Sequence, residues 1–221
     1  MKKIAVYIDA GHGGIFQGRY YTPPHIGKLY TFLDKKGKED FTIYEGEVNR
    51  KIAGKFAELC EKEGIFARKI YHDYLDTPLL TRCHLANTFF LQDKLQGYTP
   101  ILLSFHSNAF GNSSKGEGEA PRGWSVWTSK GQTEADKIAQ IWAEETKKMF
   151  GKKITIREDL SDGDSDFEEN FTILVATVMP AVLVENLFFT NREDAKLLLS
   201  EDYQNKSALV ALNTVQRYAR E

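Results

Sequence analysis

The sequence predicts an α/β protein with a single domain, in which a mostly parallel central sheet is flanked by helices on both faces. Short apolar runs of strand length alternate along the chain with longer segments of helical periodicity, a pattern typical of a parallel sheet covered by helices. In addition, 221 residues with a hydrophobic content of 42% suffice for one well-packed core. No internal repeat or low-complexity tract divides the chain.

The first part of the chain predicts a strand, a long loop, a helix and a second strand. Ile4–Ile8 is an apolar strand, and Ile15–Tyr44, with Pro23-Pro24 and several glycines, predicts an irregular loop with room for one hairpin. A helix is expected over Glu45–Glu63, and Ile65–Tyr71 follows as a strand. The apolar face of that helix consists of Val48, Ile52, Phe56 and Leu59.

The middle of the chain continues the alternation. We expect a helix over Leu79–Leu95, a strand over Ile101–Phe105, a strand over Trp124–Thr128 and a helix over Glu134–Phe150. The polar stretch Gly111–Gly123 connects the two strands.

The last part supplies one more strand and helix. Ile154–Arg157 is compatible with a strand, and the acidic stretch Glu158–Asn170 predicts a solvated loop. Within that stretch, residues 159–166 resemble a calcium loop, but no frame places glycine sixth and glutamate twelfth. Ala181–Glu185 predicts a strand that ends on a carboxylate, and Tyr203–Tyr218 predicts the closing helix.

Composition excludes several classes of partner. The net charge is −2 and basic and acidic residues are well mixed, so we expect no nucleic-acid binding. Cys60 and Cys83 both fall in predicted helices at a spacing that suits neither a metal pair nor a disulfide framework, so we expect buried free thiols. We also expect a monomer.

The N-terminus predicts neither a secretory signal peptide nor a membrane span. Met1-Lys2-Lys3 leads directly into the first strand without an apolar signal region. We therefore expect either that a leader has been removed from the chain, or that the chain is made in the cytoplasm and is released by lysis or delivered without a signal peptide.

Two histidines follow predicted strands. His12 lies in Asp-Ala-Gly-His-Gly-Gly after the first strand, and His106 lies in Ser-Phe-His-Ser-Asn-Ala after Ile101–Phe105. Open α/β folds place their sites at the carboxyl ends of parallel strands. Two histidines at such ends, together with a carboxylate, are the ligands of a His₂Glu zinc site.

The carboxylates of this site come from two regions. Glu45 and Glu47 both begin the first helix, and residues two apart point in nearly opposite directions, so only one of them can face the metal. Helical geometry favours Glu45 without deciding the choice. Glu185 finishes an apolar strand, where an unpaired carboxylate is costly, and is the candidate general base.

Four motifs in this order resemble the zinc-dependent N-acetylmuramoyl-L-alanine amidases, the family of cell-division, sporulation and phage endolysin amidases. The resemblance covers nearly the whole chain. It rests on Asp9 to Gly14, Glu45-x-x-x-Asn49, Ser104-x-His106-x-Asn108-Ala109, and Pro180 to Glu185 followed by Phe188 or Phe189 and Asn191.

The resemblance implies the function of each candidate residue. His12, Glu45 and His106 would bind Zn²⁺, which selects Glu45 over Glu47, and Glu185 would be catalytic. It further implies a phosphorylase/hydrolase-like fold, a single catalytic amidase domain over residues 1–221, peptidoglycan as substrate and the cell wall as the place of action. Because Gly111–Gly123 is too short to form the helical insertion of inhibited cell-division members, an open site is expected.

The chain departs from the family at two positions near the site. Family members usually have a glycine before a phenylalanine after the catalytic glutamate, where this chain has Asn186-Leu187-Phe188-Phe189, and many have arginine where this chain has Val175. Both differences bear on substrate contacts. Two other readings stay open. The chain could be another zinc peptidase that cuts within the stem peptide, or a wall-binding module on an inactive amidase fold.

Overall fold

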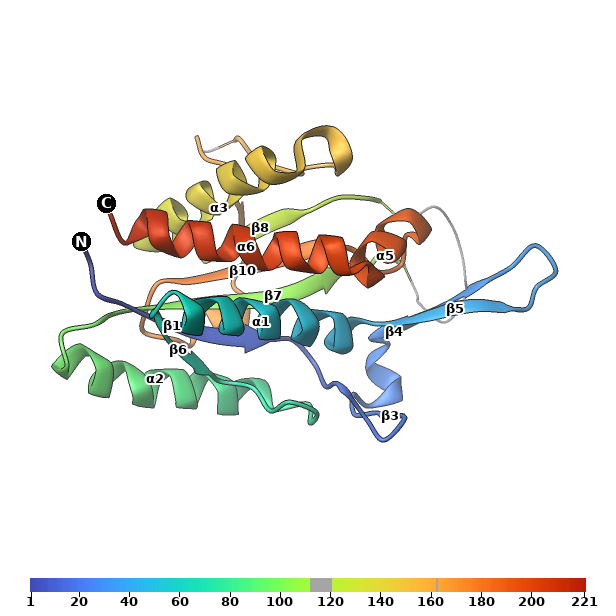
Figure 1. Ribbon diagram of the computed structural model, residues 1–221, viewed down its shortest axis with the longest axis horizontal. Helices are drawn as coiled ribbons and strands as arrows, with labels where there is room; N and C mark the ends of the chain where they lie inside the picture. Colours follow the sequence, from blue (N-terminus) through green and yellow to red (C-terminus); the bar gives the residue numbers. More distant parts are fainter. Residues whose placement is uncertain (112–120, 162) are drawn as a thin grey trace.

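The computed structural model describes residues 1–111, 121–161 and 163–221 (Figure 1). Its centre is a six-stranded sheet in the order β6-β1-β7-β10-β8-β9. β10 runs antiparallel to β8, and the remaining neighbours are parallel, which confirms the predicted fold class. In sheet order the strands are Phe66–Lys69, Ile4–Ala10, Thr99–Asn108, Ala181–Phe188, Ser125–Thr128 and Phe167–Glu168.

Helices cover both faces of this sheet, so the molecule has three layers (Figure 1). α1 (Glu45–Lys62), α3 (Glu134–Phe150) and α6 (Glu201–Tyr218) pack side by side on one face, whereas α2 (Leu79–Leu95) and the short α4 (Thr172–Val175) lie on the other. α5 (Arg192–Leu199) follows β10 and packs against α6.

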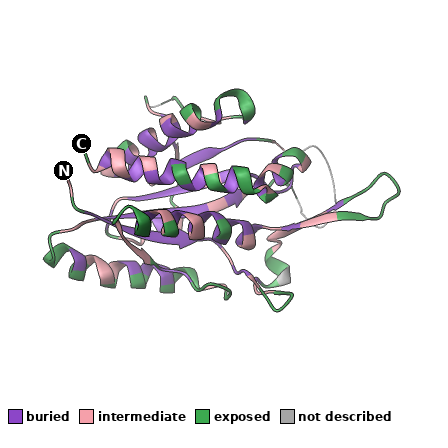
Figure 2. Cartoon of the chain, in the orientation of Figure 1, coloured by how far each residue is buried: buried purple, intermediate pink, exposed green. Residues whose placement is uncertain are grey.

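The alternation of side chains along β1 explains why both faces are covered. Val6 and Ile8 belong to the larger apolar cluster beneath α1, α3 and α6, while Ala5 and Tyr7 belong to the smaller cluster beneath α2. Successive strand residues point to opposite faces, and every residue of β1 is buried. Figure 2 shows these central strands in the buried colour.

The segment before α1 is more regular than the sequence predicts. It forms two hairpins rather than one: β2 (Ile15–Phe16) with β3 (Arg19–Tyr20), and β4 (Leu29–Leu33) with β5 (Glu39–Tyr44). A 3₁₀ turn, η1 (Pro24–Ile26), lies between them. The β4–β5 hairpin extends away from the body of the molecule (Figure 1), and its base delivers the first residue of α1.

Arg192 of α5 anchors this hairpin. Its guanidinium donates hydrogen bonds to the Asp40 carboxylate and to the carbonyl of Leu33, and it lies 5.0 Å from the ring centroid of Phe32.

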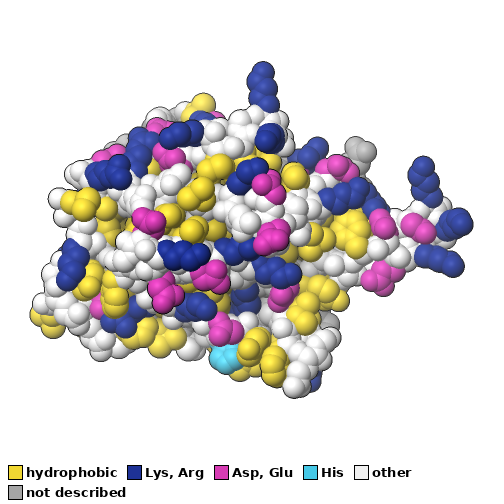
Figure 3. All heavy atoms as spheres, in the orientation of Figure 1, with side chains coloured by type: hydrophobic (Ala, Val, Ile, Leu, Met, Phe, Trp, Pro, Cys, Tyr) yellow, Lys and Arg dark blue, Asp and Glu magenta, His cyan; other side chains and the backbone are white. Residues whose placement is uncertain are grey.

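On the face seen in Figure 3, basic and acidic side chains are interspersed, as their mixing along the sequence implies.

Three further elements differ from the predictions. Ile154–Arg157 forms only an isolated bridge from Ile156 to Trp124, with the 3₁₀ turn η2 (Gly151–Lys153) before it, and the last strand of the sheet lies instead in the acidic stretch, as β9. β10 does not end at Glu185 but continues to Phe188. Of the predicted polar stretch Gly111–Gly123, residues 112–120 lie outside the described residues.

Two smaller predictions can be compared with the structure. Cys60 and Cys83 are buried and free, as expected. In the described ranges, no helix is long and apolar enough to cross a membrane.

Candidate active site

His12 follows β1 in an unusual backbone conformation. β1 ends at Ala10, and His12 has a φ of 63° in the left-handed region, which non-glycine residues adopt at an energetic cost and often at functional sites. This conformation and the neighbouring glycines turn the chain at the carboxyl edge of the sheet, where β7 also presents His106.

Close backbone packing brings the elements of the site together. A Cβ atom on Gly11 would lie 2.1 Å from Cε1 of His106, so the imidazole ring rests directly on the glycine backbone. A Cβ atom on Gly46 would lie 2.0 Å from the carbonyl oxygen of Gly13. Glycine is therefore required at both positions for the loop after β1 to touch β7 and the start of α1.

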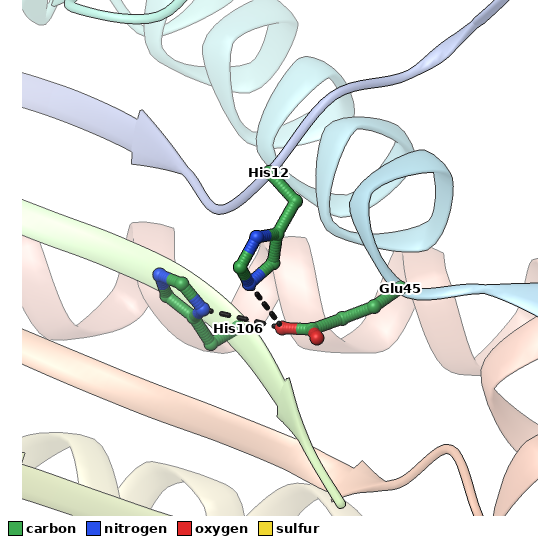
Figure 4. A group of neighbouring side chains, drawn as sticks. All are labelled: His12, Glu45 and His106. Atoms are coloured by element: carbon green, nitrogen blue, oxygen red, sulfur yellow. Dashed lines mark hydrogen bonds and ion pairs between the residues drawn. The ribbon is translucent and has the colours of Figure 1, made fainter. Parts of the chain in front are cut away.

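Three side chains converge at this edge, one each from the β1 loop, α1 and β7 (Figure 4). Glu45 Oε1 lies 3.4 Å from His12 Nε2 and 3.2 Å from His106 Nδ1. The three donor atoms all lie within 4.8 Å of one another. Glu45 is 1% exposed and each imidazole is 17% exposed, so the cluster opens to solvent on the histidine side.

Glu47, the alternative acidic residue, lies apart from this cluster. Its carboxylate accepts a hydrogen bond from the backbone N–H of Ile15 at 3.0 Å and pairs with Lys51 at 3.7 Å. The structure therefore brings Glu45, and not Glu47, to the two histidines.

The Glu45 carboxylate is ionised in this environment. Burial opposes its charge, but His12, His106 and Lys28 hold the pKa of the carboxyl well below its usual value. Burial lowers the pKa of His12 despite the attraction of Glu45. For His106 burial acts in the same direction, but the hydrogen bond and charge of Glu45 outweigh it, so the pKa is raised.

The donor set fits a tetrahedral metal ion. Ligands held about 2.0–2.2 Å from zinc at tetrahedral angles lie roughly 3.3–3.6 Å apart, close to the two distances from Glu45 Oε1. Glu45 Oε2 is buried and has no hydrogen-bond partner within the described ranges, although Lys28 Nζ lies 3.2 Å away. Two imidazoles and an anionic carboxylate are ligands that zinc commonly takes.

Glu185 lies beside this cluster. It pairs in register with His106 on the parallel strands β7 and β10, so the two side chains emerge on the same face of the sheet. Its Oε2 atom is buried and accepts no hydrogen bond from the described part of the chain. Burial raises the pKa of Glu185 to about 7, with Glu45 adding to the rise and His106 opposing it.

Irregular backbone follows Glu185. The pairing with β7 shifts register between Glu185 and Phe188, and Leu187 has a φ of 61°. The carboxylate is therefore presented at a bulge within β10 rather than at the strand end that the sequence predicts. Bulges of this kind re-aim side chains near active sites.

Two arginines hold the loop that carries His12. Arg50 donates hydrogen bonds to the carbonyls of Gly11, Gly46, His72 and Leu75. On the α2 side, Arg82 donates to the Asp9 carboxylate at 3.2 Å and to the Ala10 carbonyl at 3.3 Å. Arg50 and Lys28 were not singled out in the sequence.

This arrangement is compatible with a metal-dependent hydrolase: three side chains that could hold a metal ion lie at the carboxyl edge of a mostly parallel sheet, and a buried carboxylate lies beside them. The family model of N-acetylmuramoyl-L-alanine amidases matches residues 6–217. The chain belongs to this family, and it is an enzyme that hydrolyses amide bonds of peptidoglycan.

Solved structures show the same fold. An N-acetylmuramoyl-L-alanine amidase from Clostridium difficile 630 is 25% identical, with a TM-score of 0.72 over 100% of this chain and 99% of that one. AmiC2 of Nostoc punctiforme is 22% identical, with a TM-score of 0.70 over 99% and 98%. CwlD from Clostridioides difficile, solved in complex with the GerS lipoprotein, is 22% identical, with a TM-score of 0.69 over 97% of each chain. No curated protein sequence gave a significant match.

Proposed function

We propose that this chain is a zinc-dependent amidase that cleaves the bond between the lactyl group of N-acetylmuramic acid and L-alanine of the stem peptide. His12, Glu45 and His106 would hold the zinc ion, and Glu185 would act as general base and then general acid. The observation that carries the proposal is the convergence of these three donors within 4.8 Å, from three separate elements, with Glu185 in register beside His106.

The metal and the carboxylate have separate tasks in this proposal. Bound zinc would act as a Lewis acid that polarises the scissile carbonyl and makes water more acidic. Glu185 accepts the proton of the attacking water at its buried Oε2 atom, which has no competing hydrogen-bond partner among the described residues. It then donates this proton to the departing amino group of L-alanine.

The remaining residues position these groups. Lys28 Nζ lies 3.2 Å from Glu45 Oε2, and Glu45 Oε1 is directed towards the histidines. Asn49 donates to Glu45 Oε1 at 3.4 Å and accepts from the Ser107 hydroxyl at 3.1 Å, which links α1 to β7. Because no side chain attacks the carbonyl in this scheme, no covalent enzyme intermediate forms.

The wider proposal concerns the whole chain. Residues 1–221 would form one catalytic domain that acts as a monomer on the cell wall, with peptidoglycan as its partner and no protein activator. The single domain is supported by the family match over residues 6–217, and an open site is supported by both imidazoles, which remain accessible at its edge.

Metal analysis tests the proposal. The purified protein should contain about one equivalent of zinc, chelation should abolish hydrolysis of purified sacculi, and added zinc should restore it. His106→Ala should lose both metal and activity, whereas His84→Ala, at an exposed position on α2, should lose neither. Full activity in protein shown to be free of metal would refute the proposal.

A further inference from the structure

The acidic stretch is not fully solvated, because part of it is buried against the edge of the sheet. Ser165 and Asp166 are 3% and 1% exposed, and they lead into β9, which pairs with β8. The hydroxyl of Thr128, the last residue of β8, donates a hydrogen bond to Asp166 Oδ2. The prediction of a solvated loop is therefore wrong for these residues.

One oxygen of this buried carboxylate lacks a partner. Asp166 Oδ1 is inaccessible to solvent and has no hydrogen-bond partner in the part of the chain that the structure describes. A buried carboxylate oxygen left in this way is strongly unfavourable, so such groups are usually paired, protonated or bound to a metal ion.

The charges nearest to Asp166 make the burial harder to explain. After burial itself, the neighbouring Asp164 carboxyl has the largest effect in raising the pKa of Asp166, to about 7, and Asp136 raises it further. Asp164 also accepts a hydrogen bond from the Asp166 backbone N–H at 3.4 Å, so both residues lie on one turn of chain. Because the Asp164 carboxyl opposes ionisation of Asp166, a positive charge beside the unpartnered Asp166 Oδ1, either a proton or a cation, would stabilise the buried carboxylate.

We propose that Asp164 and Asp166 form a binding site for a hard divalent cation of the Ca²⁺ class, separate from the His12, Glu45 and His106 cluster. Carboxylate oxygens are the ligands that Ca²⁺ prefers, and water and backbone carbonyls complete its coordination of six to eight oxygens. The cation would satisfy Asp166 Oδ1 and fix the turn on which β9 begins, and so stabilise the edge of the sheet.

A calcium titration of the zinc-loaded full-length protein tests this site. Zinc keeps the histidine cluster filled, and the melting temperature is the readout, so the result does not depend on the proposed amidase chemistry. We expect a saturable rise of roughly 5–10 °C when Ca²⁺ exceeds its Kd a hundredfold. Terbium luminescence excited through Trp127, which precedes Thr128 on β8, should grow with binding and be displaced by Ca²⁺.

Matched variants test whether the calcium-dependent rise of the melting temperature comes from the turn that carries Asp164 and Asp166. Asp166→Asn and Asp164→Asn should each abolish the calcium-dependent rise, whereas Asp202→Asn, at a 75% exposed carboxylate paired with Lys206 on α6, should keep it. If Asp166→Asn fails to fold, Asp164→Asn still decides, because Asp164 is only partly buried.

Two outcomes would overturn the proposal. If the wild-type protein shows no saturable rise up to about 10 mM Ca²⁺, above the range of weak extracellular calcium modules, the carboxylate pair holds a proton. If the rise persists in both Asn variants, the cation binds elsewhere.

Discussion

Replacing Glu185 with glutamine should stabilise the metal-free protein and at the same time inactivate the zinc-loaded enzyme. Gln keeps the size of the side chain and removes the charge. Burial raises the pKa of Glu185 from 4.5 to about 7, which corresponds to at most about 3 kcal/mol of lost stability once the carboxylate is ionised. In its proposed role as general base, Glu185 would thus lower stability for the sake of function.

The sign of the effect follows from proton binding. Between pH 4.5 and about 7 the folded state holds a proton on Glu185 that the unfolded state has released, so this group's contribution to stability falls as pH rises through that window. Below it the carboxyl is neutral in both states. The gain from Glu185→Gln should therefore be small at about pH 4.5 and reach its full value above pH 7.

Urea unfolding of chelator-treated protein at about pH 4.5 and pH 8 measures the difference. Glu201→Gln, at an 80% exposed carboxylate, serves as the control and should change stability little at either pH. In the zinc-loaded enzyme, Glu185→Gln should keep the metal and lose activity by roughly 10²-fold or more. Equal stability at pH 8, loss of zinc, or near-normal turnover would each refute the reasoning.

Three further substitutions test how the site is built. Glu45→Gln should weaken zinc affinity in a chelator competition, whereas Glu47→Gln should leave it unchanged, because the Glu47 carboxylate accepts a hydrogen bond from Ile15 and pairs with Lys51 rather than with the two histidines. Gly11→Ala should displace the His106 ring and weaken zinc binding, while Gly54→Ala, with nothing within 4 Å of the added methyl, should preserve zinc binding and add up to about 1 kcal/mol of stability. Arg50→Met should cost about 3 kcal/mol or more in urea unfolding, because buried carbonyls lose their donor.

Each of these has a clear contrary result. If zinc affinity falls in the Glu47 variant and not in the Glu45 variant, Glu47 rather than Glu45 is the zinc ligand. Equal behaviour of the two glycine variants would show that the backbone contact at Gly11 does not position His106. An Arg50 variant as stable as the wild type would mean that water replaces its hydrogen bonds.

The main strands and helices could be predicted because their apolar periodicity is strong. β1 and α1 lie where the pattern places them, since each buries a continuous apolar face. α5 is too short to show a clear apolar pattern. However, the residue before its first turn is a helix-capping residue, from which the start of the helix could have been predicted. Asn191 caps it by accepting hydrogen bonds from the backbone N–H groups of Glu193 and Asp194.

Strand ends were harder to predict because the sheet continues through polar residues. β7 includes His106 and extends to Asn108, and β10 continues past Glu185 to Phe188. A polar side chain that faces a site is compatible with strand pairing, so hydrophobicity alone ends both strands too early. The bulge after Glu185 depends on pairing with β7, which has no local sequence signal.

The candidate site was predicted for residues next to strong patterns and missed for residues that arrive by tertiary packing. His12 and His106 follow apolar strands, so the sequence already places them at one edge. Lys28 reaches Glu45 only because the β4–β5 hairpin returns the chain to the start of α1. Arg50 reaches the carbonyls of Gly11 and Leu75 across two loops whose paths the sequence does not determine.

Mass spectrometry of the products from purified sacculi tests the central claim most directly. The zinc-loaded enzyme should release intact stem peptides that begin with a free L-alanine amino group, and leave glycan strands with free lactyl carboxyl groups. Glu185→Gln protein that retains zinc should release neither product at a comparable rate. Peptides shortened at their carboxyl ends, with L-alanine still attached to the glycan, would contradict the account and identify a peptidase that cuts within the stem.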